Sequence, residues 1–265
     1  MSETKPVTPV APVPAATVLI VRDSPAGLEV FMVKRHHEID FVAGALVFPG
    51  GKVHAGDREA GLSDHTDGVE GWSAEQRALG AAAIREAFEE SGILFARDEG
   101  GRQLVSAEHL ARLDAYRQPL EKDEMSLLDV LRRERLRLAC DHLVPFAHWI
   151  TPENMPKRFD TQFFLAAAPP GHAGAHDGRE SVDSVWIRPE TAIADRKRWN
   201  VIFPTKLNLM KLAQAKTVAE ADTFARANPP LTVMPWVEQT AEGPRLRIRD
   251  DAGYAQTSAL LRDAL

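Results

Sequence analysis

The chain has 265 residues, a formal net charge of -6 and 44% hydrophobic residues. This length and composition predict one enlarged globular domain with a substantial core. The acidic balance gives no overall basic field for nucleic acid, and no stretch reaches the ~18 apolar residues of a membrane span, so neither nucleic acid nor a membrane is an expected partner.

Residues 1–15 are rich in Pro, Ala, Val and Thr, and we expect them to form a flexible tail. They lack the apolar core of a signal peptide. The single cysteine, Cys140, excludes an intramolecular disulfide, and its amphipathic surroundings predict a buried thiol. These features favour a cytoplasmic protein, because thiols stay reduced in that compartment.

The first half of the chain predicts strands that lead into a helix. Three strands are expected, over residues 16–22, 28–34 and 45–48. A helix is expected over 75–91, because Gly92 is a natural C-terminal cap. Between them, residues 57–74 are polar and contain glycine.

The second half of the chain mixes helices and strands. Helices over 107–117 and 126–138 predict a helical insertion that occupies residues 105–140. The elements expected after it are strands over 143–150, 161–168 and 182–187, helices from 189, over 204–215 and over 218–227, and a closing hairpin of 231–236 with 245–249. Residues 256–265 are expected as a C-terminal tail, which leaves one domain over 16–255. Without a regular βαβ alternation, the predicted fold class is α+β.

Three glutamates of the predicted helix over 75–91 are placed unusually. On a helical wheel, Glu86, Glu89 and Glu90 fall within an arc of ~100°. Like charges at these spacings cost ~0.2–0.5 kcal/mol for each pair, and the helix dipole disfavours negative charge in the last turn. A divalent cation would offset both costs, and Mg²⁺ prefers such hard oxygen ligands.

These glutamates belong to a recognisable motif. The run Arg85-Glu86-Ala87-Phe88-Glu89-Glu90-Ser91-Gly92-Ile93 matches the core of the Nudix box, and Phe48-Pro49-Gly50-Gly51-Lys52 resembles the start of that box. The chain therefore resembles the Nudix hydrolases. The resemblance implies a mixed β-sheet sandwiched between helices, a requirement for Mg²⁺ or Mn²⁺, and cleavage of a nucleoside diphosphate linked to another moiety.

The resemblance departs from the family pattern at one place. The family leaves five residues, a Glu and seven more residues between its Gly and its Arg, whereas residues 52–84 separate Gly51 from Arg85 here. The excess over the family spacing implies an insertion over residues 57–74, which we expect to affect substrate range more than stability. The family's middle Glu should lie eight positions before Arg85, but Arg77 occupies that position and Glu75 is the nearest acid.

The resemblance also implies roles for individual residues. Glu86, Glu89, Glu90 and the backbone carbonyl of Gly50 are the expected metal ligands, and Arg85 is expected to orient one of the glutamates through a bidentate pair. A further ligand or general base is expected from an acid just upstream of Trp186, either Glu180 or Asp183. The bland alternative for both acids is an ordinary surface position.

Three cations are candidates for binding substrate phosphates: Arg35, Lys52 and Arg158. Arg35 is near the end of the second strand, and the alternative to phosphate binding is that it ends an edge strand in solvent. Arg158 lies beside Phe159, where it could instead accompany core aromatic residues. His54 is expected at the surface, because it lacks metal-ligand spacing.

The insertion within the box, together with Arg158-Phe159-Asp160-Thr161-Gln162-Phe163-Phe164 and Phe203-Pro204-Thr205, resembles a peroxisomal coenzyme A diphosphatase branch. Coenzyme A or an acyl-coenzyme A is therefore the favoured small-molecule substrate, with ADP-ribose or NADH as alternatives. The last residues do not form a peroxisomal Ser-Lys-Leu signal, so the peroxisome is not carried over. A catalytically silent module that senses nucleotides is the alternative function, and a homodimer stays open.

Overall fold

The computed structural model describes residues 10–36, 44–178 and 181–264. Its centre is a mixed sheet with the strand order β10-β2-β1-β9-β8-β11, to which β3 and β4 attach beside β2 and β1. The strands of this main sheet are β1 (Val13–Ser24), β2 (Gly27–Arg35), β3 (Leu46–Val47), β4 (Gly50–Lys52), β8 (Val144–Ile150), β9 (Phe159–Ala167), β10 (Ser181–Ile187) and β11 (Thr232–Val233). The fold is therefore α+β with a mixed sheet, as the sequence predicts.

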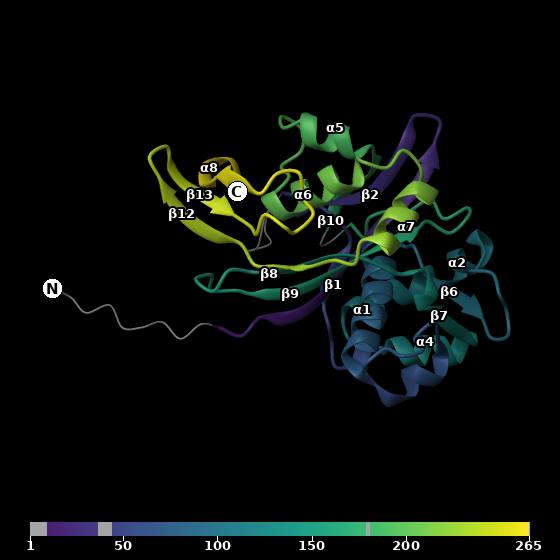
Figure 1. The fold of residues 1–265 in the computed structure, drawn as a ribbon. Coiled ribbons are helices and arrows are strands. Elements are labelled where there is room, and N and C mark those ends of the chain that lie inside the picture. The colour runs from purple at the N-terminus through teal and green to yellow at the C-terminus, as the bar shows by residue number, and fades with distance from the viewer. Residues whose placement is uncertain (1–9, 37–43, 179–180, 265) are drawn as a thin grey trace.

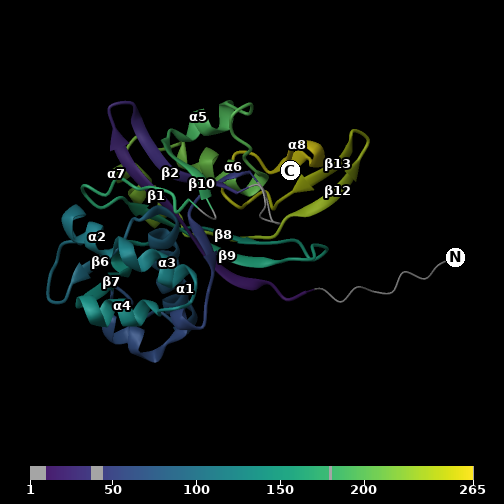
Figure 2. The ribbon, with the colours of Figure 1, turned by 180° about the vertical axis from the view of Figure 1, so that it is seen from behind.

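Helices cover both faces of the main sheet (Figure 1), and Figure 2 shows the same two layers from behind. The helices are α1 (Ala74–Ser91), α2 (Ala107–Leu113), α3 (Arg117–Glu121), α4 (Leu127–Glu134), α5 (Pro189–Ala194), α6 (Phe203–Leu212), α7 (Val218–Ala227) and α8 (Leu261–Ala264). Alternate residues of β1 point to opposite faces. Val18 and Ile20 join the core beneath α1, whereas Leu19 and Val21 join the core beneath α6 and α7.

The helix α1 begins and ends where its sequence provides caps. Ser73 accepts a hydrogen bond from the backbone N–H of Gln76, whose side chain accepts one from Ser73 in return. This reciprocal pair satisfies two of the unpaired donors at the start of the helix. Gly92 adopts a left-handed conformation with φ of 66°, and its N–H donates to the carbonyl of Phe88. The C-terminal glycine cap predicted from the sequence is thus confirmed.

The predicted insertion over 57–74 is packed structure. It forms two 3₁₀ helices, Gly56–Arg58 and Ala60–His65, and the strand β5 (Thr66–Asp67). β5 pairs with β7 (Leu136–Ala139), which also pairs with β6 (Ala96–Asp98), so a second small sheet covers α1. The helical insertion ends in that strand, and the helix expected over 126–138 is therefore wrong after Glu134.

The ends of the chain also differ from expectation. β1 begins at Val13, inside the segment expected as a tail. The residues expected as a C-terminal tail form β14 (Ser258–Leu260) and α8. The predicted hairpin has the wrong first partner, because β11 joins β8 in parallel, while β12 (Trp236–Thr240) pairs with β13 (Gly243–Arg247). No helix in the described ranges is long and apolar enough to cross a membrane.

Candidate active site

A cleft of about 380 Å³ lies between the end of α1 and the strands β1, β4 and β9. Glu86, Glu89 and Glu90 form its charged wall, although each residue is less than 9% exposed. The remaining lining residues come from several separate segments of the chain: Ala15, Thr17, Arg35, Gly50, Gly51, Lys52, His54, Glu121, Phe159, Thr161 and Asp177. The cleft thus gathers the three glutamates that the sequence singles out.

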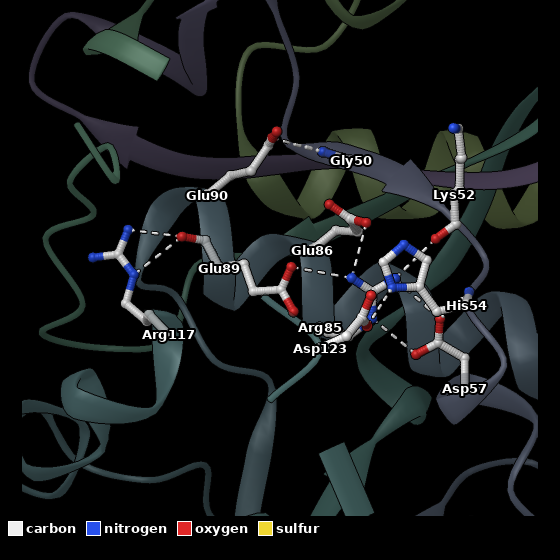
Figure 3. A network of polar contacts seen from close by, with 10 residues as sticks. All are labelled: Gly50, Lys52, His54, Asp57, Arg85, Glu86, Glu89, Glu90, Arg117 and Asp123. Atoms are coloured by element: carbon white, nitrogen blue, oxygen red, sulfur yellow. Dashed lines mark hydrogen bonds and ion pairs between the residues drawn. The ribbon is translucent and has the colours of Figure 1, made fainter. Parts of the chain in front are cut away.

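The glycine pair before Lys52 lets β4 lie directly against α1. A Cβ atom on Gly51 would come within 2.4 Å of Glu86 Oε1, and one on Gly50 would come within 2.5 Å of the Ala16 carbonyl oxygen. Only residues without a side chain permit this approach. The N–H of Gly50 donates to Glu90 Oε2 at 3.0 Å, which ties the strand to the helix (Figure 3).

Arg85 holds the carboxylate wall from behind (Figure 3). Its Nη1 donates to Glu86 Oε1 at 2.9 Å and to Glu89 Oε2 at 3.1 Å. Its Nε and Nη2 donate to the two carboxylate oxygens of Asp57 at 2.9 and 3.0 Å, and Nη2 also donates to the Lys52 carbonyl. Burial by itself would lower the pKa of Arg85, but the charges of Glu86 and Asp57 raise it above its ordinary value.

Asp57 is a buried partner of Arg85 that the sequence interpretation does not identify, because it assigns this residue to the insertion. Asp57 is 3% exposed, and its carboxylate also accepts a hydrogen bond from the N–H of His54 at 2.8 Å. Counted forward from Gly51, five residues precede Asp57, as in the family pattern. The extra residues therefore lie between Asp57 and Arg85. Glu75, the nearest acid counted backward, pairs with Arg58 near the surface.

Burial disfavours the ionised forms of two glutamates of the wall, Glu86 and Glu89. Burial raises the pKa of Glu89 to about 8 and also raises the pKa of Glu86, against the opposing effect of Arg85. Glu89 Oε1 is buried and accepts no hydrogen bond. Within the described ranges, no three His, Cys, Asp or Glu side chains already form a metal-binding group. The unpartnered oxygen and the buried carboxylates nevertheless fit a hard divalent cation.

Two further acids line the cleft from outside the motif. Asp177 belongs to the loop before β10, and Glu121 is the last residue of α3. Asp183 points elsewhere, since it is exposed and absent from the lining, and Glu180 lies outside the described residues. Nothing in the sequence distinguishes Asp177 from the neighbouring acids, because only the path of its loop brings it to the glutamates.

The predicted cations divide into two groups. Arg35 and Lys52 line the cleft, and Arg35 Nε is buried without a hydrogen-bond partner. Arg158 does not line it: its guanidinium donates to the carbonyls of Thr151 and Val10, which gives this residue a structural role. His54 was expected at the surface but lines the cleft, with Nδ1 3.3 Å from Asp123 Oδ1.

Comparisons with known proteins identify relatives of this chain. A family model described as the NUDT19 Nudix domain matches residues 63–208. Acyl-coenzyme A diphosphatase NUDT19 of Xenopus laevis is 25% identical over 215 residues, which cover 66% of this chain and 57% of that protein. Putative nudix hydrolase 7 of Caenorhabditis elegans is 27% identical over 210 residues, which cover 78% of this chain and 63% of that protein. The chain thus spans less than two thirds of either relative.

A solved structure shares the fold. The crystal structure of a NUDIX hydrolase from Alicyclobacillus acidocaldarius has a TM-score of 0.62 and 24% sequence identity, and the match covers 83% of this chain and 97% of that one.

Proposed function

Because the chain belongs to the Nudix hydrolase family, in the branch of the acyl-coenzyme A diphosphatase NUDT19, we propose that it hydrolyses the diphosphate bond of coenzyme A or an acyl-coenzyme A. Water would attack one phosphorus of the P–O–P linkage and break its bond to the bridging oxygen, which releases two phosphate-bearing products. Localisation in the cytoplasm is part of the same proposal.

The observation that carries this proposal is the buried carboxylate wall, in which Glu89 Oε1 has no partner. Glu86, Glu89, Glu90 and the Gly50 carbonyl are the groups that would hold Mg²⁺ or Mn²⁺. When bound, such an ion neutralises phosphate charge and lowers the pKa of an attacking water. Arg85 and Asp57 keep the glutamates in place, since their hydrogen bonds fix the orientation of the wall.

The remaining cleft residues have complementary tasks in this proposal. Asp177 and Glu121 are carboxylates near the wall, so either can accept a proton from the attacking water. Arg35 and Lys52 are the cations that would meet the phosphate oxygens. Phe159 offers an aromatic ring at the same cleft, where the base of a nucleotide can stack.

ADP-ribose and NADH are the alternative substrates of this diphosphatase, and a silent nucleotide sensor is the alternative function. The sensor is disfavoured by the intact set of Arg85, Glu86, Glu89 and Glu90, because binding without turnover has less need of so costly a buried charge cluster.

The test is the release of phosphate-bearing products from coenzyme A, acetyl-coenzyme A, ADP-ribose and NADH, each with Mg²⁺, with Mn²⁺ and with a chelator. We expect metal-dependent cleavage, fastest for one of the two coenzyme A compounds. Cleavage of ADP-ribose or NADH alone would replace the substrate assignment. Absence of any cleavage by folded protein, with nucleotide binding retained in the chelator, would favour the sensor.

A further inference from the structure

Arg117, the first residue of α3, connects the helical insertion to the end of α1. Its Nε and Nη2 donate to the backbone carbonyl of Glu89 at 3.1 and 2.9 Å (Figure 3). The same Nη2 donates to the carbonyl of Ala175 at 3.0 Å. One guanidinium therefore joins the helix that bears the carboxylate wall to the loop that bears Asp177.

The position of Arg117 follows from the way α1 ends. The last carbonyls of a helix have no partner within the helix. In α1 the Glu89 carbonyl is taken by Arg117, and the Ser91 carbonyl accepts from the N–H of Ala175 at 2.8 Å. A positive charge at this end also opposes the negative end of the helix dipole.

The loop before β10 is held at several points. The N–H of Ser181 donates to Asp177 Oδ1 at 3.0 Å, the N–H of His176 donates to Ser184 Oγ at 3.2 Å, and Arg117 connects the loop to the end of α1 through the Ala175 carbonyl. Trp186 Nε1 donates to the Ala173 carbonyl at 2.6 Å. Gly174 lies so close to Phe31 that a Cβ atom would come within 2.7 Å of the ring. Ala175 follows, bound to both Ser91 and Arg117, and two residues later Asp177 enters the cleft.

We propose that Arg117 is a positioning residue for catalysis, which fixes the wall of the cleft that carries Asp177 relative to the wall that carries Glu89. It acts through the two backbone carbonyls and does not touch the substrate. This inference rests on the proposed hydrolase function and assigns a catalytic task to the helical insertion.

The test is a double-mutant cycle of Arg117→Ala with Asp177→Asn, measured as kcat and KM under saturating Mg²⁺. If Arg117 acts by placing Asp177, each single variant lowers kcat roughly 10- to 100-fold, as expected for a displaced catalytic group. The double variant should then be no slower than Asp177→Asn, because the two changes remove the same contribution. Multiplied effects, or wild-type kcat in either single variant, would overturn the inference.

Two variants separate positioning from general support. Asp114→Asn removes the ion pair that Asp114 makes with Arg117 Nη1 at 3.2 Å but leaves both carbonyl contacts, so kcat should not change. Arg117→Lys keeps the positive charge but lacks the planar fork that spans two carbonyls, so its kcat should resemble that of Arg117→Ala. Full activity of Arg117→Lys would show that charge alone suffices and would contradict the bridge.

The outcomes also separate this inference from the proposed function. Absence of turnover by the wild-type protein on every compound would refute the hydrolase. Wild-type turnover that Glu90→Gln abolishes and Arg117→Ala leaves intact would refute only the role of Arg117. If Arg117→Ala fails to fold, the same cycle is measured with Arg117→Lys.

Discussion

At the residue scale, the decisive feature is the burial of charge at the end of α1. Arg85 is shared between Asp57 on one side and Glu86 and Glu89 on the other. One guanidinium cannot balance three carboxylates, which explains why the pKa values of Glu86 and Glu89 are raised by burial in spite of Arg85.

Glu89 predicts how stability depends on pH in the absence of metal. Its pKa is about 8 in the fold against an ordinary value of 4.5, so the folded state binds more protons between these values. The free energy of unfolding should therefore fall as the pH rises from about 5 to 8. Urea unfolding at several pH values, with a chelator present, measures this free energy. In the Glu89→Gln variant it should fall less over the same pH range. A steeper decline in the variant would contradict the assignment.

The glutamates also predict the cost of losing a single charge. Glu89→Gln and Glu90→Gln should lower kcat by roughly 10²-fold or more, while the fold survives because the amide keeps an oxygen that can accept the same hydrogen bond. Steady-state kinetics and circular dichroism check both statements. Glu75→Gln is the matched control on the same helix, since this acid pairs with Arg58 near the surface. Near-wild-type turnover in both site variants would remove the proposed site.

Asp57 predicts a stability effect of different origin. Asp57→Asn leaves the Arg85 guanidinium buried without its bidentate partner, and breaking a buried ion pair costs about 3–5 kcal/mol. The measurement is urea unfolding with added Mg²⁺. Asp64→Asn, an exposed acid of the same segment, is the control and should change little. Equal, small effects of the two substitutions would show that the Arg85 pair is not structural.

At the element scale, the extra residues of the box behave as part of the core. Leu62 is 5% exposed, β5 pairs with β7, and Trp72 stacks with Phe164 at 6.5 Å between ring centroids. These contacts predict that the segment contributes to stability, and its expected effect on substrate range stays a prediction.

A deletion of residues 58–72 should consequently prevent stable folding, because it removes β5 and the buried side chain of Leu62. Leu62→Ala isolates the packing component and should cost about 2–5 kcal/mol. Thermal unfolding of both variants measures the effect. A deletion variant with the wild-type melting temperature would show that this segment contributes little to stability.

Sequence reasoning succeeded where local signals determine the element. The helix α1 has a glycine cap and a carboxylate motif, and β1 and β2 are apolar runs on either side of a short turn. It failed where a distant partner decides. Leu136–Ala139 continues a helical pattern in the sequence but forms a strand that pairs with β5 and β6. β11 pairs with β8 and does not form the predicted hairpin. Asp177 could not be identified because its place depends on contacts with α1 and α3.

At the scale of the whole molecule, the main sheet separates two hydrophobic cores. The core beneath α1 contains the carboxylate helix and both insertions, and the core beneath α6 and α7 contains the remaining helices. The cleft opens where β4 attaches to β1. Ala15 and Thr17 of β1 line it, and β1 pairs with both β4 and β9. The pairing of β1 on both edges holds this side of the cleft in place. The other sides of the cleft come from α1, α3 and the loop before β10.

The central position of β1 also determines when its two edges can pair as the chain is synthesised. One edge of β1 pairs with β2 at once through a short turn, but its other neighbour, β9, leaves the ribosome only after both insertions, since Val13 pairs with Phe159. At about 5–20 residues per second, this delay is on the order of ten seconds. During that time the apolar run of β1 presents an unpaired edge, which is a template for aggregation. We therefore expect the nascent chain to depend on chaperones until β9 emerges, even though the finished sheet is well covered.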